Sequence, residues 1–379
     1  MKDKGALGII VSGGPAPGIN NVIFSALIEA SNLGWKVFGA QGGFEAIDGK
    51  SAEAWEILNP DELTDIRFTG GSILGTSRFN PFESEKSTNV FLNSLAQKYI
   101  DKLIIIGGEG SAYLSYKLTT IKSDIKVIHV PKTIDNDLKL PHSHPSFGFE
   151  TARFVGTEIL ETMLIDAKTS KRWFIVTSMG RNAGFLALGL GIASGAHLTL
   201  IPEEFNTEEK PTLDEIADIA MNCISKRTAI GKNYGLIIIA EGVLQKIDPN
   251  SNERIKNCPR DNIGRLSYSK IDIGELLLPI IEEKVTAMNL KCKLYAKNLG
   301  YELRCHSPVS FDMEYTKFLG CGAVMHLNSG KTGVMVVRDF DQLSEVPLND
   351  LVGSNGKMLS RTVNIGSDLY KIAAKYMFR

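Results

Sequence analysis

The sequence lacks a large net charge, a paired-cysteine motif and any long apolar run. Its 379 residues carry 42 Lys and Arg against 43 Asp and Glu, so neither a nucleic-acid surface nor an acidic-lipid surface is favoured. The five cysteines form no Cys-x-x-Cys pair, as expected of reduced thiols in a cytoplasmic protein. No uninterrupted apolar stretch reaches the roughly 20 residues of a membrane span. These absences predict a cytoplasmic protein that binds neither nucleic acid nor membrane.

Apolar strand-like runs alternate with longer amphipathic segments along the chain, a pattern typical of a doubly wound α/β fold. The length favours two domains. A polar stretch from Lys246 to Ser269 predicts a long surface excursion. In open parallel sheets ligands bind just outside the carboxyl ends of the strands, so the ends of these runs are candidate site positions. The runs are Ala6 to Val11, Val37 to Gln41, Leu103 to Ile106, Val127 to Val130, Trp173 to Thr177, and Gly235 to Ala240.

Two of the runs are followed by a glycine turn and then a helical pattern. The first turn, residues 12–20, reads Ser-Gly-Gly-Pro-Ala-Pro-Gly-Ile-Asn, and the second, residues 107–111, reads Gly-Gly-Glu-Gly-Ser. Glycine lets backbone N–H groups approach phosphate oxygens, and the following helix adds partial positive charge. The spacing fits neither Walker A nor G-x-G-x-x-G. The pair indicates phosphate binding, although a tight strand-to-helix turn without a ligand explains either turn alone.

An acidic segment follows the run at 127–130. Residues 131–137 read Pro-Lys-Thr-Ile-Asp-Asn-Asp. One carboxylate there can accept a proton from a substrate hydroxyl while the other holds Mg²⁺ beside a polyphosphate. Glu109 is a further Mg²⁺ ligand, or else a helix-start acid favoured by the helix dipole. Arg78 ends a glycine-containing loop and could offset charge in the transition state. The pattern predicts phosphoryl transfer to an alcohol.

These motifs resemble, collinearly over almost the whole chain, those of the phosphofructokinase family, which has ATP-dependent and pyrophosphate-dependent branches. Residues 13–20 match the family's first phosphate loop, residues 108–111 its donor-metal turn, and residues 131–137 its most specific motif. The resemblance implies a donor site and Mg²⁺ on Glu109 and Asp137. The implied donor-binding residues are Gly13, Gly14, Arg78, Phe79, Gly108, Gly110 and Ser111.

The same resemblance implies the catalytic roles. Asp135 would accept the proton of the fructose 6-phosphate 1-hydroxyl, while Arg78 and Lys132 act on the phosphates and Thr133 positions the sugar. A carboxylate such as Asp135 is ionised at neutral pH unless its surroundings perturb it. Most of the acceleration should then come from positioning and charge neutralisation.

The acceptor site is implied by motifs in the second half of the chain. Met-Gly-Arg at 179–181 matches the family's substrate motif, and Glu241 matches a strand-end glutamate that holds sugar hydroxyls. Arg172 falls where the family sends an arginine across a subunit interface. A sugar phosphate carries about two negative charges and needs forked arginines. The implied substrate-binding residues are Thr133, Asp135, Arg172, Met179, Gly180, Arg181, Glu241, Tyr301 and Arg304.

Two positions give opposite indications about the phosphoryl donor. Family members that use ATP generally have glycine at the position of Gly110, where an aspartate would repel a nucleotide α-phosphate. Members that use pyrophosphate typically have lysine at the position of Lys132, where an ammonium can hold the terminal phosphate. Because some ATP-dependent members combine the glycine with the lysine, the sequence favours ATP, with pyrophosphate as the alternative.

The expectation is therefore a 6-phosphofructokinase of two Rossmann-like doubly wound lobes with the site in the cleft between them. Residues 1–146 with part of 305–350 would form the donor lobe, and residues 147–304 with 351–379 the fructose 6-phosphate lobe. A homodimer or homotetramer follows if Arg172 reaches a neighbouring chain. Sedoheptulose 7-phosphate is an alternative acceptor. Because Glu109 replaces the family's usual aspartate, a noncatalytic sugar-phosphate-binding subunit is the alternative of another class.

Overall fold

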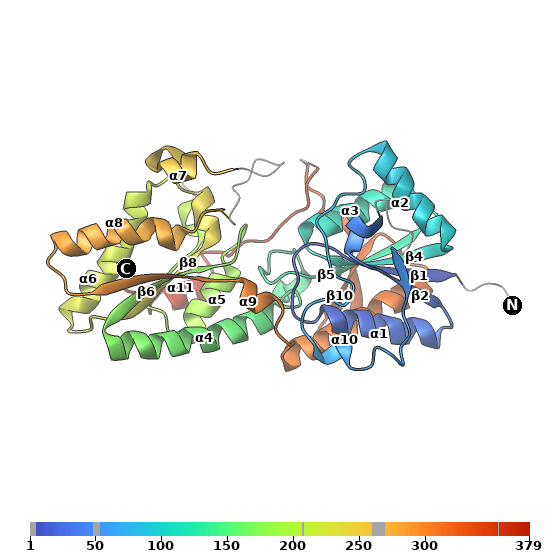
Figure 1. Cartoon of the computed structure of the whole chain (residues 1–379), viewed down its shortest axis with the longest axis horizontal. Coiled ribbons are helices and arrows are strands. Elements are labelled where there is room, and N and C mark those ends of the chain that lie inside the picture. The colour runs from blue at the N-terminus through green and yellow to red at the C-terminus, as the bar shows by residue number, and fades with distance from the viewer. Residues whose placement is uncertain (1–4, 48–53, 207, 260–269, 355) are drawn as a thin grey trace. The chain divides into compact units, whose positions relative to one another are not determined.

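The computed structural model describes residues 5–47, 54–206, 208–259, 270–354 and 356–379. The chain divides into two compact units, shown with their elements in Figure 1. The first unit comprises Met1–Ala152 and Leu303–Arg361, and the second comprises Arg153–Glu302 and Thr362–Arg379. Of the predicted surface excursion, residues 260–269 lie outside the described residues.

The first unit is built on a mixed sheet of seven strands in the order β11-β10-β5-β4-β1-β2-β3. Its central strands pair in parallel and consist of almost uninterrupted buried Ile, Leu and Val, as expected where helices cover both faces. The two edge strands, β3 and β11, run antiparallel to their neighbours. The strands are β1 (Ala6–Val11), β2 (Lys36–Ala40), β3 (Trp55–Ile57), β4 (Ile100–Gly107), β5 (Lys126–Pro131), β10 (Val334–Asp339) and β11 (Gln342–Pro347).

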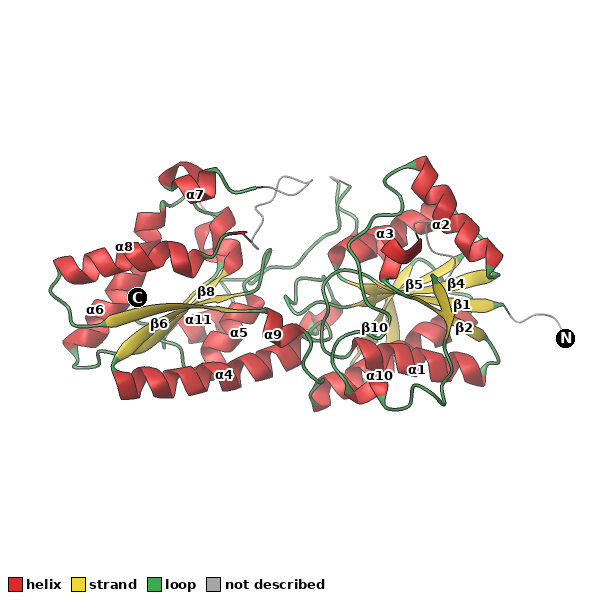
Figure 2. Cartoon of the chain, in the orientation of Figure 1, coloured by secondary structure: helices red, strands yellow, loops and turns green. Residues whose placement is uncertain are grey.

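Helices lie on both faces of this sheet (Figure 2). Helices α1 (Ile19–Asn32) and α10 (Ser310–Asn328) pack on one face against the side chains of alternate strand residues. Helices α2 (Glu85–Gln97) and α3 (Glu109–Ile121) pack on the other. The C-terminal part of this unit extends to Arg361. The sequence analysis had placed that part within residues 305–350. Leu351 and Met358 account for this, because both are buried with strand β10 in a further core of the unit.

The strand order reverses between β1 and β4. Strand β2 lies on one side of this pair and strand β5 on the other. Such a switch point opens a crevice outside the carboxyl ends of the two strands, where ligands bind in doubly wound sheets. The two glycine turns, residues 12–20 and 107–111, follow these two strands.

The second unit has a four-stranded, all-parallel sheet in the order β7-β8-β6-β9. Side chains from α6 and α8 fill its larger core. In the view of Figure 1, α8 lies above this sheet and α4 below it. Both units are therefore doubly wound α/β structures, as the sequence predicts. The strands are β6 (Arg172–Ser178), β7 (Leu198–Leu200), β8 (Gly235–Ala240) and β9 (Lys293–Leu299).

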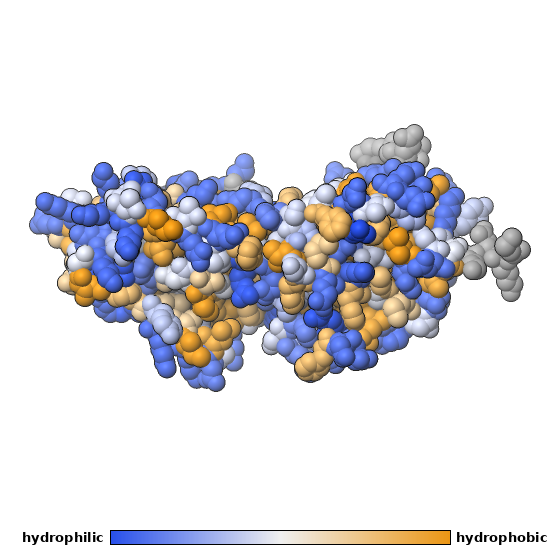
Figure 3. Space-filling view, turned by 90° about the horizontal axis from the view of Figure 1, so that it is seen from below, coloured by the Kyte–Doolittle hydropathy of each residue, from blue (hydrophilic) through white to orange (hydrophobic). Residues whose placement is uncertain are grey.

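The remaining helices complete the described chain. Among the described residues, no helix has both the length and the apolar content needed to cross a bilayer. On the face drawn in Figure 3, hydrophilic and hydrophobic residues are interspersed. The α-helices not yet given are α4 (Phe149–Ser170), α5 (Phe185–Ser194), α6 (Leu213–Ala229), α7 (Glu253–Lys256), α8 (Ile273–Ala287), α9 (Tyr301–Arg304) and α11 (Asp368–Ala374).

Candidate active site

The loop after β1 is fastened to the loop that carries Arg78. The Gly13 N–H donates to the Ser77 carbonyl at 2.8 Å, and the Thr76 hydroxyl donates to the Gly13 carbonyl at 2.7 Å. Gly13 has φ +85°, a left-handed conformation that glycine adopts at little cost. Arg78 is exposed, and its neighbour Phe79 is half-buried against the core. Two segments about sixty residues apart in sequence thus meet beside the switch point.

Lys132 reaches into this loop from the end of β5. Its Nζ donates a hydrogen bond to the Gly14 carbonyl, and its backbone N–H donates to the Gly107 carbonyl at 2.9 Å. The side chain is only 3% exposed. Burial, assisted by repulsion from Arg304 and Arg78, lowers the pKa of Lys132 to about 7, although Asp135 and Asp137 oppose the shift. Near neutral pH Lys132 is therefore only partly protonated, and an incoming anion would favour its ammonium form.

Arg304 belongs to the first unit and lies over the same loop. A Cβ placed on Gly14 would be 3.5 Å from the Arg304 Cζ. The sequence analysis grouped Arg304 with the second lobe, but its guanidinium joins Arg78 and Lys132 in one group of positive charges. A polyphosphate is the kind of ligand that three converging cationic side chains recognise.

The acidic segment that follows Lys132 adds two carboxylates to the cluster. Asp135 is half-buried and Asp137 is buried. The Asp135 N–H donates to the Thr133 hydroxyl at 3.1 Å, which closes a tight turn between them. Since both carboxylates act electrostatically on Lys132, the structure brings together the residues that the sequence assigns to proton transfer and to phosphate binding.

The second glycine turn begins helix α3. Gly108 precedes the helix with no side-chain cap, and Glu109 and Gly110 form its first turn. Ser111 is buried, and its hydroxyl oxygen lies against Gly107, where an added Cβ would come within 2.1 Å of it. Gly110 is exposed, and a Cβ added there would meet nothing within 4 Å. The helix N-terminus is thus open to a ligand on the Gly110 side.

A divalent cation would find carboxylate ligands at two places in this unit. No group of three or more His, Cys, Asp or Glu residues suited to a metal occurs in the described part of the chain. Mg²⁺, however, is commonly held by one or two carboxylates together with substrate phosphates. Glu109 and Asp137 offer the oxygen ligands that such an ion prefers, so the residues present fit a Mg²⁺ that arrives with a polyphosphate.

In the second unit, the turns after β6 and β8 are joined. The Gly242 N–H donates to the Gly180 carbonyl at 3.1 Å, and the Gln245 side chain donates to the Arg181 carbonyl at 2.9 Å. Gly180 has φ +130°, which L side chains rarely adopt. These bonds hold the Met179–Arg181 segment beside Glu241, which begins the turn after β8.

Tyr301 and Arg172 occupy contrasting places in the same unit. Gly300, which precedes Tyr301, packs on Met179, because a Cβ there would lie 2.6 Å from the Met179 Cε, and Tyr301 is exposed. Arg172 begins strand β6 and so lies at the opposite end from Met179. Its guanidinium stacks on Tyr295, with Cζ 5.0 Å from the ring centroid, and its Nε is 3.6 Å from Asp166. Within its unit Arg172 is therefore not brought to the Met179–Arg181 segment.

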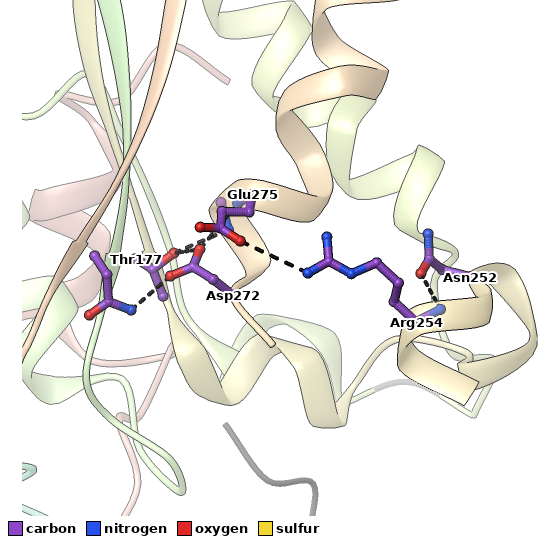
Figure 4. Close-up of polar contacts among 7 residues, drawn as sticks. Thr177, Asn252, Arg254, Asp272 and Glu275 are labelled. Carbon is purple, nitrogen blue, oxygen red and sulfur yellow. Dashed lines mark hydrogen bonds and ion pairs between the residues drawn. The ribbon is translucent and has the colours of Figure 1, made fainter. Parts of the chain in front are cut away.

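A polar network that the sequence analysis did not find supports these strand ends (Figure 4). Asp272 accepts hydrogen bonds from the Thr177 hydroxyl at 2.7 Å and from the Asn298 amide at 2.7 Å. It also caps α8 by accepting from the Glu275 N–H at 3.1 Å. Thr177 is near the end of β6 and Asn298 near the end of β9. The signal was available, because Asp before an apolar helical pattern with Glu three residues later is a typical helix start.

Comparison with known proteins identifies the family. The phosphofructokinase family model matches residues 6–327. The chain belongs to the phosphofructokinase family. This member is 40% identical to a Thermotoga maritima protein named pyrophosphate–fructose 6-phosphate 1-phosphotransferase, over 98% of this chain and 90% of that protein. It is 38% identical to a Naegleria fowleri protein of the same name, over 100% of this chain and 89% of that one.

Relatives named as ATP-dependent match this chain at lower sequence identity. A Chloroflexus aurantiacus protein named ATP-dependent 6-phosphofructokinase is 32% identical over 92% of each chain. Among solved structures, the pyrophosphate-dependent phosphofructokinase of Marinobacter aquaeolei superposes with a TM-score of 0.72 at 20% identity, covering 98% of this chain and 90% of that one. At that identity the structural likeness shows the fold alone, which agrees with the predicted α/β lobes.

Proposed function

We propose that the protein transfers a phosphoryl group to the 1-hydroxyl of fructose 6-phosphate and forms fructose 1,6-bisphosphate. One observation carries the proposal: Lys132, Arg78 and Arg304 converge on the Gly13–Gly14 loop beside Asp135 and Asp137. Phosphoryl transfer depends mainly on charge neutralisation and positioning, and this cluster supplies both, next to a carboxylate that can take a proton. Membership of the phosphofructokinase family supports the choice of reaction.

The residues of the first unit divide the chemistry among them. Asp135 accepts the proton that leaves the attacking hydroxyl, and Thr133, bonded to the Asp135 backbone, positions the sugar beside it. Lys132 and Arg78 hold the phosphoryl oxygens as the bond to the donor breaks. Glu109 and Asp137 would hold Mg²⁺, which supplies Lewis-acid neutralisation of the donor phosphates when bound.

The residues of the second unit bind the acceptor. Arg181 and Tyr301 offer donors to the 6-phosphate, and the Glu241 carboxylate accepts bonds from sugar hydroxyls. Arg172 faces away from them along β6, so its predicted role requires a second copy of the chain and a homodimer or homotetramer. None of the five cysteines, all of which the structure describes, forms a disulfide, which supports a reducing compartment such as the cytoplasm.

ATP is the donor that the open space at Gly110 supports. Neither packing nor backbone conformation requires glycine there, since a Cβ would meet nothing within 4 Å and φ is not positive. Glycine in a helix interior costs about 1 kcal/mol relative to alanine, and part of that cost applies at the second residue of α3. No contact within the protein accounts for glycine at this position. It is accounted for if a bulky ligand group, such as the α-phosphate and ribose of a nucleotide, occupies the space beside Gly110.

Pyrophosphate is the second candidate, and Lys132 supports it. Pyrophosphate has no nucleoside and so lacks the contacts that a nucleoside makes. The buried Lys132 side chain at the loop, when protonated, compensates by holding a terminal phosphate. The relatives at 40% and 38% identity are both named for pyrophosphate. The experiment is to follow fructose 1,6-bisphosphate formation by the purified chain with Mg²⁺ and each donor at matched concentrations. Sedoheptulose 7-phosphate should be offered as a second acceptor. Binding of fructose 6-phosphate without turnover on either donor would favour the noncatalytic subunit.

Gly110→Asp is expected to lower kcat/KM for ATP by about a hundredfold while changing kcat/KM for pyrophosphate much less. A carboxylate at that position would repel the α-phosphate, and like charges placed together cost several kcal/mol. The matched control is Gly110→Ala, which fills the same first carbon position without charge. ATP turnover that is equally strong in wild type and Gly110→Asp would remove Gly110 from the choice of donor.

A further inference from the structure

Arg361, the last residue of the first unit, is hydrogen-bonded to the acidic segment. Its backbone N–H donates to the Asp137 carbonyl at 2.8 Å. Its Nε donates to the Asn136 carbonyl at 2.7 Å, and its Nη2 donates both to the Asn136 side-chain oxygen and to the His144 carbonyl, the latter at 2.7 Å. A single residue more than two hundred positions away in sequence therefore braces the turn that contains the proposed base.

The residue that Arg361 holds has an unfavourable backbone conformation. Asn136 is buried and has φ +58°, in the left-handed region that non-glycine residues seldom occupy, although Asn enters it more often than most of them. Such conformations persist only where the surroundings enforce them. The Asn136 side-chain oxygen also accepts from the Ser146 N–H at 3.0 Å, and the Ser146 hydroxyl donates to the Thr133 carbonyl at 2.7 Å. Since Asn136 stands between Asp135 and Asp137, its backbone angles decide where both carboxylates point.

The chemistry of arginine suits this position. A guanidinium has donors in a rigid planar fork and can bond two separate backbone turns at once, whereas a lysine ammonium is a single point of charge. Burial lowers the pKa of Arg361, and the negative charge of Asp137 opposes that shift. The group stays protonated, because a guanidinium titrates far above neutral pH. Arg361 thus holds the acidic segment in place by hydrogen bonds and also supplies it with a permanent positive charge.

We propose that Arg361 is a positioning residue for phosphoryl transfer: it keeps Asn136 left-handed and so fixes the placement of Asp135 and Asp137. The inference rests on the proposed function, because the placement matters to turnover only if Asp135 acts as the base. Arg361 itself touches no substrate in this account. Its loss should therefore lower kcat and leave the KM values for donor and acceptor nearly unchanged.

The test compares Arg361→Ala and Arg361→Lys with the control Arg338→Ala. Arg338 is also an arginine of the first unit with a largely buried side chain, paired with Glu314 at 2.7 Å and stacked on Tyr315. Two readouts are measured on each full chain: kcat and KM with both substrates, and amide hydrogen exchange in the peptide covering residues 131–147. Hydrogen exchange reports the order of the segment whether or not the enzyme turns over.

Arg361→Ala should lower kcat about ten- to a hundredfold, change each KM less than threefold, and speed exchange in the 131–147 peptide, as expected for lost preorganisation. Arg361→Lys should resemble Arg361→Ala. Arg338→Ala should leave kcat unaltered, although the charge of Arg338 acts on His144 in the same peptide. Unchanged exchange in Arg361→Ala would overturn the proposal, and so would faster exchange with an unaltered kcat. If the wild-type protein phosphorylates nothing but Arg361→Ala still speeds exchange, Arg361 orders the segment and the proposed function is refuted instead.

Discussion

Asp135→Asn is expected to lower kcat for fructose 6-phosphate phosphorylation by about a hundred- to ten-thousandfold, the range that a positioned general base contributes. The amide has almost the shape of the carboxylate and can still accept a hydrogen bond, so the KM for fructose 6-phosphate should change little. What it cannot do is accept the proton that leaves the attacking hydroxyl. Steady-state kinetics with saturating donor and varied fructose 6-phosphate measure both quantities.

Two controls separate proton transfer from charge and from metal binding. Asp124→Asn makes the same chemical change at an exposed position, where the carboxylate pairs with Lys122 at 3.1 Å, and it should leave kcat unaltered. Asp137→Asn should also lower kcat, but raising the Mg²⁺ concentration should restore part of the loss if Asp137 is a metal ligand. Turnover that survives intact in Asp135→Asn would refute the assignment of the base.

The parallel core of each sheet could be predicted from the sequence. Strands β1 and β8 begin and end where their apolar runs do, because central strands covered on both faces are nearly continuous runs of Ile, Leu and Val. Strand β9 was not predicted. Its residues from Lys293 to Leu299 include exposed charged positions, as on a sheet edge. The β10–β11 hairpin was missed for a similar reason, since the exposed and half-buried residues of β11 carry little apolar signal.

The candidate site was predictable where it is local in sequence. Glycine turns at strand ends and the 131–137 segment carry their chemistry within a few residues, so Gly13, Lys132 and Asp135 could be named in advance. Contacts between distant segments could not be named. Nothing near Arg361 indicates that its guanidinium would reach Asn136, and nothing near Arg304 indicates that it would lie against Gly14 in the loop after β1. Such pairings depend on the tertiary fold, which one sequence does not reveal.

Lys132→Met is expected to lower kcat/KM for the donor by about a hundred- to a thousandfold, the usual cost of removing one charged contact to a transition state. Methionine has nearly the length of lysine and suits the buried position, so the loss should come from charge and not from packing. Lys139→Met is the matched control, because Lys139 lies just beyond the 131–137 segment and its side chain is exposed. Equal kcat/KM values in Lys132→Met and wild type would show that the ammonium does not act on the donor.

The same variant should change how donor binding depends on pH. In the free protein the pKa of Lys132 is about 7, so above that pH most molecules hold a neutral amine. A bound polyphosphate favours the ammonium and raises this pKa, so binding takes up a proton there and affinity must fall as pH rises, by at most tenfold per pH unit. Below pH 7 the amine is already protonated and this contribution disappears. Calorimetric titration with a nonhydrolysable ATP analogue from pH 6 to 9 should show the additional slope in wild type and not in Lys132→Met. The analogue's own titration is common to both proteins, so identical slopes would mean that Lys132 keeps one protonation state throughout.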